Sequence, residues 1–86
     1  MANILAVQQG LIDRLRARRK EAKLSQRVLA DRAQVSWGSI KRFEQTGEIA
    51  LTSLLRLAVV LGYENDFNLL FARPNFQSLD EMLNAK

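Results

Sequence analysis

Residues 36 to 47 combine cations with small and polar side chains at helical spacing. At about 3.6 residues per turn, one side of a helix over this stretch carries Gly38, Lys41, Arg42 and Gln45. This side has no large apolar group and has two positive charges. Arginine can hold a guanine edge through two hydrogen bonds, and lysine can neutralise a phosphate. These residues could therefore bind the phosphates and base edges of a nucleic acid.

Two short helices joined by a tight turn must position this surface. The other side of the second helix suits a core, because it carries Ile40 and Phe43. The preceding segment has its own apolar face, with the small Ala30 where the two helices must come close, and the turn falls near Gln34. This pattern is typical of a helix-turn-helix, in which the first helix crosses the DNA backbone and the second enters the major groove.

Further landmarks surround these two helices at a characteristic joint spacing: Leu24, Ser25, Gln26, Leu29, Ala33, Val35, Ser36, Ser39, Glu44, Gly47, Leu54, Leu57, Ala58, Leu61 and Gly62. On these residues the chain from about 11 to 62 resembles the Xre family of helix-turn-helix regulators, the phage Cro and repressor type. The family often has glycine where this chain has Lys23 and Gln34. Both residues are therefore expected to adopt a positive φ at some energetic cost.

Apolar spacing and capping residues predict an all-α fold with five helices. The first runs from about residue 7 or earlier to 22, with Leu11, Leu15 and Ala22 on one stripe. The second begins after Ser25, the third spans about 36–45, the fourth is capped by Thr52 or Ser53 and ends at Gly62, and the fifth spans about 65–72. Residues 1–86 are predicted to be a single repressor-like domain. Its helix-turn-helix core covers about 11–62, and helix five with a short C-terminal extension covers 63–86.

The composition excludes several classes of site. The 86 residues include no cysteine and no histidine, which removes disulfides, thiolate metal sites and the commonest general base and zinc ligand. We therefore expect no enzyme activity, no metal, no cofactor and no small-molecule substrate. The longest apolar run, 57–61, is far too short to span a bilayer, and no signal peptide is apparent. The expected location is cytoplasmic, with no membrane partner.

Charge is distributed unevenly along the sequence. Residues 14–42 contain ten cations and two acids, a net charge of +8, whereas residues 43–86 contain three cations and six acids, a net charge of −3. A run of charge is often only a solvated helix surface. Beside a helix-turn-helix, the basic half indicates a polyanionic partner, double-stranded DNA.

The candidate DNA-binding residues are Gln26, Arg27, Ser36, Trp37, Gly38, Ser39, Lys41, Arg42 and Thr46. Arg42 is the preferred base reader, with a phosphate contact or a solvated side chain as the alternative. Lys41 is expected to contact a phosphate. Trp37 could lie against a thymine methyl group or the sugar-phosphate backbone, or it could pack on helix two as structure. Gly38 cannot hydrogen-bond a base through a side chain but permits close approach.

The resemblance to the Xre family implies two further roles. A glutamine at the position of Gln26 commonly contacts a phosphate and braces the recognition helix. An arginine in helix one and a glutamate at the end of the recognition helix form a partly buried pair, and Arg19 and Glu44 occupy the matching positions. This pair is expected to be structural, fixing helix three against helix one.

One recognition helix covers few base pairs, so a homodimer on a palindromic operator is expected. The resemblance places the dimer interface in helix five and beyond, at Leu69, Leu70, Phe71 and Phe76, with Tyr63 and Phe67 as other candidates. These residues could instead close the core of the monomer, which is the favoured interpretation for Phe67 and Phe71. For Phe76, an interface is favoured.

Residues 53–82 resemble the antitoxins that pair with Hip-type serine/threonine kinase toxins. This resemblance implies an autorepressing regulator that also holds a kinase-type toxin, with the acidic C-terminal half as the surface for that protein. A stand-alone or phage-type repressor shares the same core. An interaction module that has lost specific DNA binding is the third possibility, supported by the weak hydrogen-bonding capacity of Trp37 and Gly38.

Overall fold

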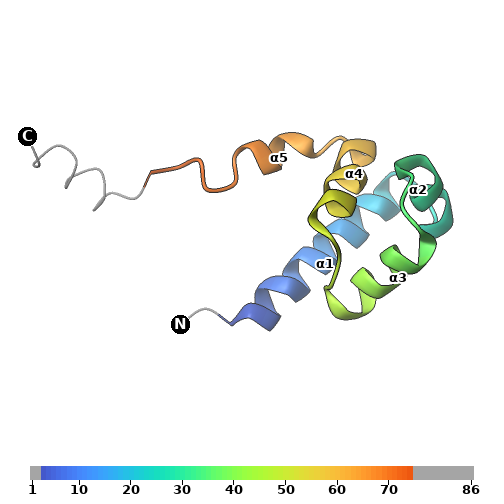
Figure 1. Cartoon of the computed structure of the whole chain (residues 1–86), viewed down its shortest axis with the longest axis horizontal. Coiled ribbons are helices and arrows are strands. Elements are labelled where there is room, and N and C mark those ends of the chain that lie inside the picture. Colours follow the sequence, from blue (N-terminus) through green and yellow to red (C-terminus); the bar gives the residue numbers. More distant parts are fainter. Residues whose placement is uncertain (1–2, 75–86) are drawn as a thin grey trace, which may run out of the picture.

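The computed structural model describes residues 3–74, which form five α-helices and no strand. This confirms the predicted all-α, five-helix class. The helices are α1 (Ile4–Glu21), α2 (Gln26–Ala33), α3 (Trp37–Thr46), α4 (Leu51–Leu61) and α5 (Glu64–Asn68). α3 packs against α1 and α2, and α4 packs against α2 and α5. α2 and α3 lie at one end of the molecule, and the chain after α5 leads away from them (Figure 1).

Capping residues set most of the helix boundaries. The hydroxyls of Ser25 and Ser36 each accept a hydrogen bond from the backbone N–H three residues on, both at 3.1 Å. They satisfy one of the free N–H groups that begin α2 and α3. Gly47 and Gly62 end α3 and α4 with φ values of 81° and 84°, a conformation that glycine adopts without steric cost. The observed starts of α2 and α3 and the end of α4 agree with those predicted from the sequence.

Two non-glycine residues turn the chain after α1 and α2. Lys23 and Gln34 have φ values of 60° and 56°. In both places the N–H of the next residue bonds back to a carbonyl of the last helical turn, at 3.1 and 3.0 Å. These bonds stabilise a left-handed residue that carries a Cβ. The prediction of a positive φ at both positions is confirmed.

The start of helix four differs from the prediction. Its N-cap is Ala50, with φ −66° and ψ 140°, and no side chain hydrogen-bonds the free N–H groups there. Thr52 and Ser53, predicted as the cap, lie within the first turn of α4. The preceding loop enters the helix earlier than the polar residues alone indicated.

Replacing Ala50 with serine should raise the free energy of unfolding by about 1 kcal/mol, because the hydroxyl can accept one of the free N–H bonds. Urea unfolding of both proteins measures the change. Thr52→Ala is the control and should have little effect on the start of the helix. A loss of about 1 kcal/mol in the control would place the cap at Thr52 instead.

The core lies where α1, α2, α3 and α4 meet. Its fully buried large side chains are Phe43, Leu29, Ile40 and Leu57. In α1 the predicted stripe is wrong in part. Ala22 is exposed, whereas Ile12, which the sequence reading omitted, is buried at 3% exposure. The cause is the orientation of α1, whose inward line runs through Ile12, Leu15 and Arg19.

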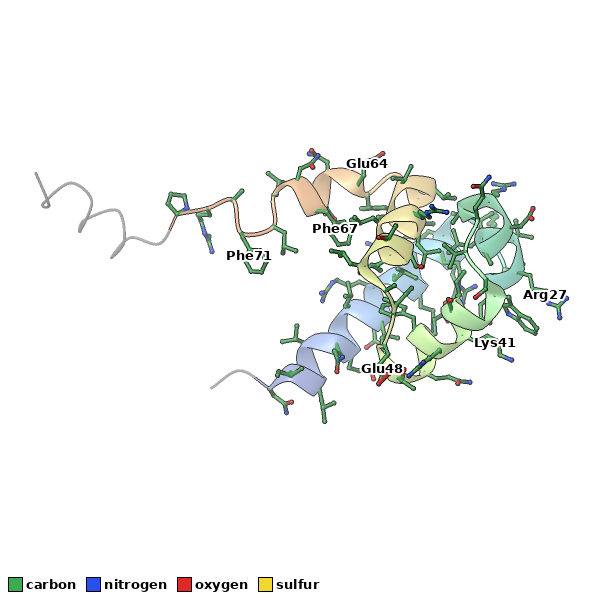
Figure 2. The ribbon with its side chains drawn as sticks, in the orientation of Figure 1. Arg27, Lys41, Glu48, Glu64, Phe67 and Phe71 are labelled. Atoms are coloured by element: carbon green, nitrogen blue, oxygen red, sulfur yellow. The ribbon has the colours of Figure 1, made fainter. Side chains whose placement is uncertain are left out.

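Helix five is shorter than predicted, because it ends at Asn68 rather than near residue 72. Phe67 packs against the core. The favoured interpretation of Phe71 is wrong: this residue is 96% exposed, with a φ of 61°, and closes no core. The left-handed turn carries its ring away from the helices (Figure 2).

Candidate nucleic-acid interface

α3 has two faces of different chemistry. The inward face carries the buried residues Ile40, Phe43 and Glu44. The outward face carries Gly38, Lys41, Arg42 and Gln45, of which only Lys41 is partly buried. Lys41 lies at the same end of the molecule as Arg27 of α2 (Figure 2). The helix-turn-helix therefore exposes cations and leaves room for close approach at Gly38.

The inward carboxylate of Glu44 holds three helices together. Arg19 of α1 donates to it from Nε at 2.9 Å and from Nη2 at 3.1 Å. Gln26 at the start of α2 donates from Nε2 to Oε1 at 3.1 Å. The side chain of Glu44 is only 4% exposed and that of Arg19 10%. The two residues expected to pair thus form a buried ion pair that fixes α3 against α1 and α2.

Arg16 joins this network, a role that the sequence reading missed. Its Nε lies 3.1 Å from the Glu44 carboxylate, and its Nη2 donates to the Glu44 backbone carbonyl at 3.1 Å. The charge pattern indicated only that Arg16 belongs to the basic stretch of residues 14–42. Arg16 precedes Arg19 by three residues, so the two share one helical face. That spacing was the signal available in the sequence.

Opposing effects set the acidity of Glu44. Burial penalises the charged carboxylate, and the hydrogen bonds from Arg19, Gln26 and Arg16, with the charge of Arg19, favour it. The favourable interactions outweigh the burial, so the pKa of Glu44 lies below its ordinary value of 4.5. Glu44 is therefore ionised at neutral pH.

The lowered pKa predicts a stability that depends on pH. Because the folded pKa lies below the unfolded one, the contribution of Glu44 is fully present above about pH 4.5 and is lost as pH falls through the folded value. Urea unfolding at pH 7, 5 and 3 should show the loss in the acidic range only. The same series on Glu44→Gln should show a shallower dependence, and an equal slope in both proteins would contradict the assignment to Glu44.

Gln26 and Trp37 continue the network to the surface. Gln26 uses its Nε2 on Glu44, and its Oε1 accepts a hydrogen bond from the indole Nε1 of Trp37 at 3.2 Å. Trp37 is 38% exposed. Of the two interpretations left open, this geometry favours packing on α2. Gln26 braces the recognition helix through both ends of its amide, which leaves one N–H for any phosphate.

Three other candidate residues are engaged in holding the ends of α3. Ser36 caps the helix and its hydroxyl lies 2.7 Å from that of Ser39. The Thr46 hydroxyl donates to the Arg42 carbonyl at 2.7 Å and accepts from the Glu48 N–H at 3.1 Å. The hydroxyls of Ser36 and Thr46 therefore bond backbone groups at the two ends of α3, and that of Ser39 bonds the capping serine.

Arg42 lies on the outward face, as the helical spacing requires, and its guanidinium pairs with Glu48 in the following loop. The arginine and glutamate side chains are 67% and 59% exposed, so water competes with the pair. Gln45 is exposed one turn beyond Lys41 and Arg42, on the face that the helical spacing predicted, although it was not named among the candidate DNA-binding residues.

Two other basic residues of α1, Arg14 and Arg18, lie away from α3. Arg14 and Arg18 line a groove between α1, α4 and α5 that also contains Leu61 and Phe67. Arg18 further pairs with Glu21 at 2.8 Å. These cations therefore point to a different side from the outward face of α3.

The candidate dimer residues lie at the end remote from α3. Leu69 and Leu70 are 64% and 57% exposed, and with Phe71 they form an unpartnered apolar surface, whereas Tyr63 lines the groove that contains Arg14 and Phe67. The described residues include nothing that covers this surface. Phe76 lies outside the described residues.

Within residues 3–74, no group of three or more histidine, cysteine, aspartate or glutamate side chains could hold a metal ion. No helix in this part of the chain has the length and apolar character needed to cross a membrane.

Comparison with known proteins agrees with this geometry. The family model described as a helix-turn-helix domain matches residues 11–66, more than half of the sequence. No curated protein and no solved structure matches the chain. The matched residues include both helices of the motif, the turn between them and the Arg19–Glu44 pair. The chain belongs to the helix-turn-helix domain family.

Proposed function

We propose that this protein is a transcriptional regulator that binds specific DNA sequences through α3. One observation carries this proposal. The single carboxylate of α3, Glu44, is turned inward and paired with two arginines, so both charged side chains on the outward face of α3, Lys41 and Arg42, are cations. A helix that exposes cations and buries its acid suits the major groove, where phosphates line both edges.

Arg42, Gln45 and Lys41 are the proposed contacts from the middle of α3. Arginine can bind guanine through two hydrogen bonds, and glutamine can bind adenine in the same way. Arg42 must exchange Glu48 for DNA, which a strongly exposed pair permits at little cost. Lys41 is assigned to a phosphate. Gly38 lets the backbone of α3 approach the base edges.

A homodimer on a palindromic operator is part of the proposal. The apolar surface at residues 69–71 lies away from α2 and α3 (Figure 1), so pairing there leaves both recognition helices free. Two copies related by a two-fold axis would then address two half-sites.

The finer proposal is an autorepressing antitoxin of the Xre type with a Hip-type serine/threonine kinase as its toxin partner. It rests on the resemblance of residues 53–82 to such antitoxins. The exposed acids Glu64 and Asp66 of α5 are proposed as polar contacts for that protein partner. A stand-alone or phage-type repressor is the alternative. We further propose that the protein is not an enzyme, because the sequence lacks histidine and cysteine. A cytoplasmic location is also part of the proposal, since the DNA that it would bind lies there.

An interaction module without specific DNA binding is the second candidate function. The observation that favours it is the hydrogen bond of Trp37 to Gln26, which occupies the only indole donor. With Gly38 next to it, the first turn of α3 offers no free side-chain donor at these two positions.

A mobility-shift titration against the DNA upstream of the protein's own gene tests the proposal. Arg42→Ala should weaken binding to that duplex by roughly fivefold to 150-fold, equivalent to the 1–3 kcal/mol of a bidentate base contact. Arg14→Ala is the matched control, because it removes an exposed arginine from the α5 side of the molecule. Weak binding that is indifferent to sequence and to Arg42 would instead favour the interaction module.

A further inference from the structure

Trp37 lies at the centre of a small group of cations on the helix-turn-helix. The guanidinium carbon of Arg27 lies 3.9 Å from the centre of the indole ring, and the Lys41 ammonium lies 4.3 Å from it. One cation comes from α2 and the other from α3. Both distances are within the range of cation–π attraction, so the ring holds the two positive charges close to it.

The ring itself is held by the buried network. Its N–H is bonded to Gln26, which is bonded to Glu44, which is paired with Arg19 and Arg16. Moving the indole onto a base would break the first of these bonds. The hydrogen bond to Gln26 thus fixes the position of the Trp37 ring. Because Arg27 and Lys41 pack against this ring, their charges are held in place with it.

Neither cation has a carboxylate partner within residues 3–74. The ion pairs of this part of the chain involve Arg16, Arg18, Arg19 and Arg42, not Arg27 or Lys41. Two like charges gathered around one ring repel each other, and a shared anion relieves that repulsion. Since both side chains lie at the α2–α3 end of the molecule, an anion there would belong to a ligand of the helix-turn-helix (Figure 2).

We infer that Trp37 is a positioning residue that holds Arg27 and Lys41 as a paired binding site for the phosphodiester backbone of duplex DNA. This inference rests on the proposed function. It assigns Trp37 no base contact. Arg27 and Lys41 fix the register of α3 on the backbone, and sequence is read further along the helix.

The test measures dissociation constants by fluorescence anisotropy with two labelled duplexes, the DNA upstream of the protein's own gene and a scrambled version. Salt is varied from about 50 to 200 mM. Arg27→Gln and Lys41→Gln should each weaken binding to both duplexes by roughly fivefold to tenfold. Each should also reduce the slope of log affinity against log salt by about 1, and the double variant should reduce this slope by about 2. The ratio between the two duplexes should not change.

Trp37→Leu distinguishes positioning from a base contact. This substitution removes no charge, yet it should weaken binding to both duplexes equally and reduce the salt slope, because Arg27 and Lys41 are no longer held together. Trp37→Phe keeps a ring and should restore most of the slope. Circular dichroism must show that each variant is folded, and Arg14→Gln is the matched charge control.

Two results would overturn the inference while leaving the proposed function intact. In the first, the wild-type protein binds DNA, but neither Arg27→Gln nor Lys41→Gln changes the salt slope of binding. The second is a Trp37→Leu protein that loses its preference between the duplexes at an unchanged slope, which would make Trp37 a base reader. If the wild-type protein bound neither duplex, the inference and the proposed function would both be wrong.

Discussion

Replacing Glu44 with glutamine should lower the free energy of unfolding by about 3 kcal/mol or more. The substitution leaves Arg19 buried without its counter-charge, and it sets an amide N–H₂ against groups that can only donate. Urea unfolding followed by circular dichroism measures the loss. A small domain has about 5–15 kcal/mol in total, so the variant should remain folded at low denaturant.

Glu48→Gln is the matched control, because it removes the same group from an exposed ion pair with Arg42. It should cost less than about 1 kcal/mol. Arg19→Gln combined with Glu44→Gln should cost less than the sum of the two single changes, since no charge is then left buried without a partner. Equal, small losses in Glu44→Gln and Glu48→Gln would contradict the structural role of the buried pair.

Placing glutamate at Gly38 should weaken binding to operator DNA by roughly 100-fold or more, because like charges brought together at an interface cost several kcal/mol. Gly38 is exposed on the outward face of α3, and an added Cβ there would meet only the Ser36 hydroxyl, at 4.0 Å. The helix should therefore accept the new side chain without rearrangement. Mobility shifts with the DNA upstream of the gene provide the measurement.

Gly38→Ala separates charge from bulk. It should keep the affinity within a few-fold and raise the free energy of unfolding by about 0.5–1 kcal/mol, because alanine loses less backbone entropy in a helix than glycine. Unchanged DNA binding by Gly38→Glu would show that α3 does not enter the groove in the proposed manner.

Local signals in the sequence determined most of the helix boundaries. Ser25 and Ser36 accept hydrogen bonds from the N–H groups three residues on, Gly47 ends α3, and Gln34 adopts the left-handed conformation between α2 and α3. Each of these depends on backbone groups within a few residues, so residue type and spacing were sufficient. The failure at Ala50 has the same explanation, because a helix without a capping side chain leaves no local signal at its start.

Apart from the Arg19–Glu44 pair, which the family resemblance implied, only the tertiary structure decided which distant side chains meet. Arg16 and Glu44 are 28 positions apart, and Gln26 and Trp37 are 11 apart. The sequence showed that α3 has an outward basic face, but it left Trp37 equally suited to DNA and to packing. It also did not reveal that Phe71 is exposed. Helical spacing fixes the face of a helix on which a residue lies, whereas its partners depend on how the helices are rotated and crossed in the folded core.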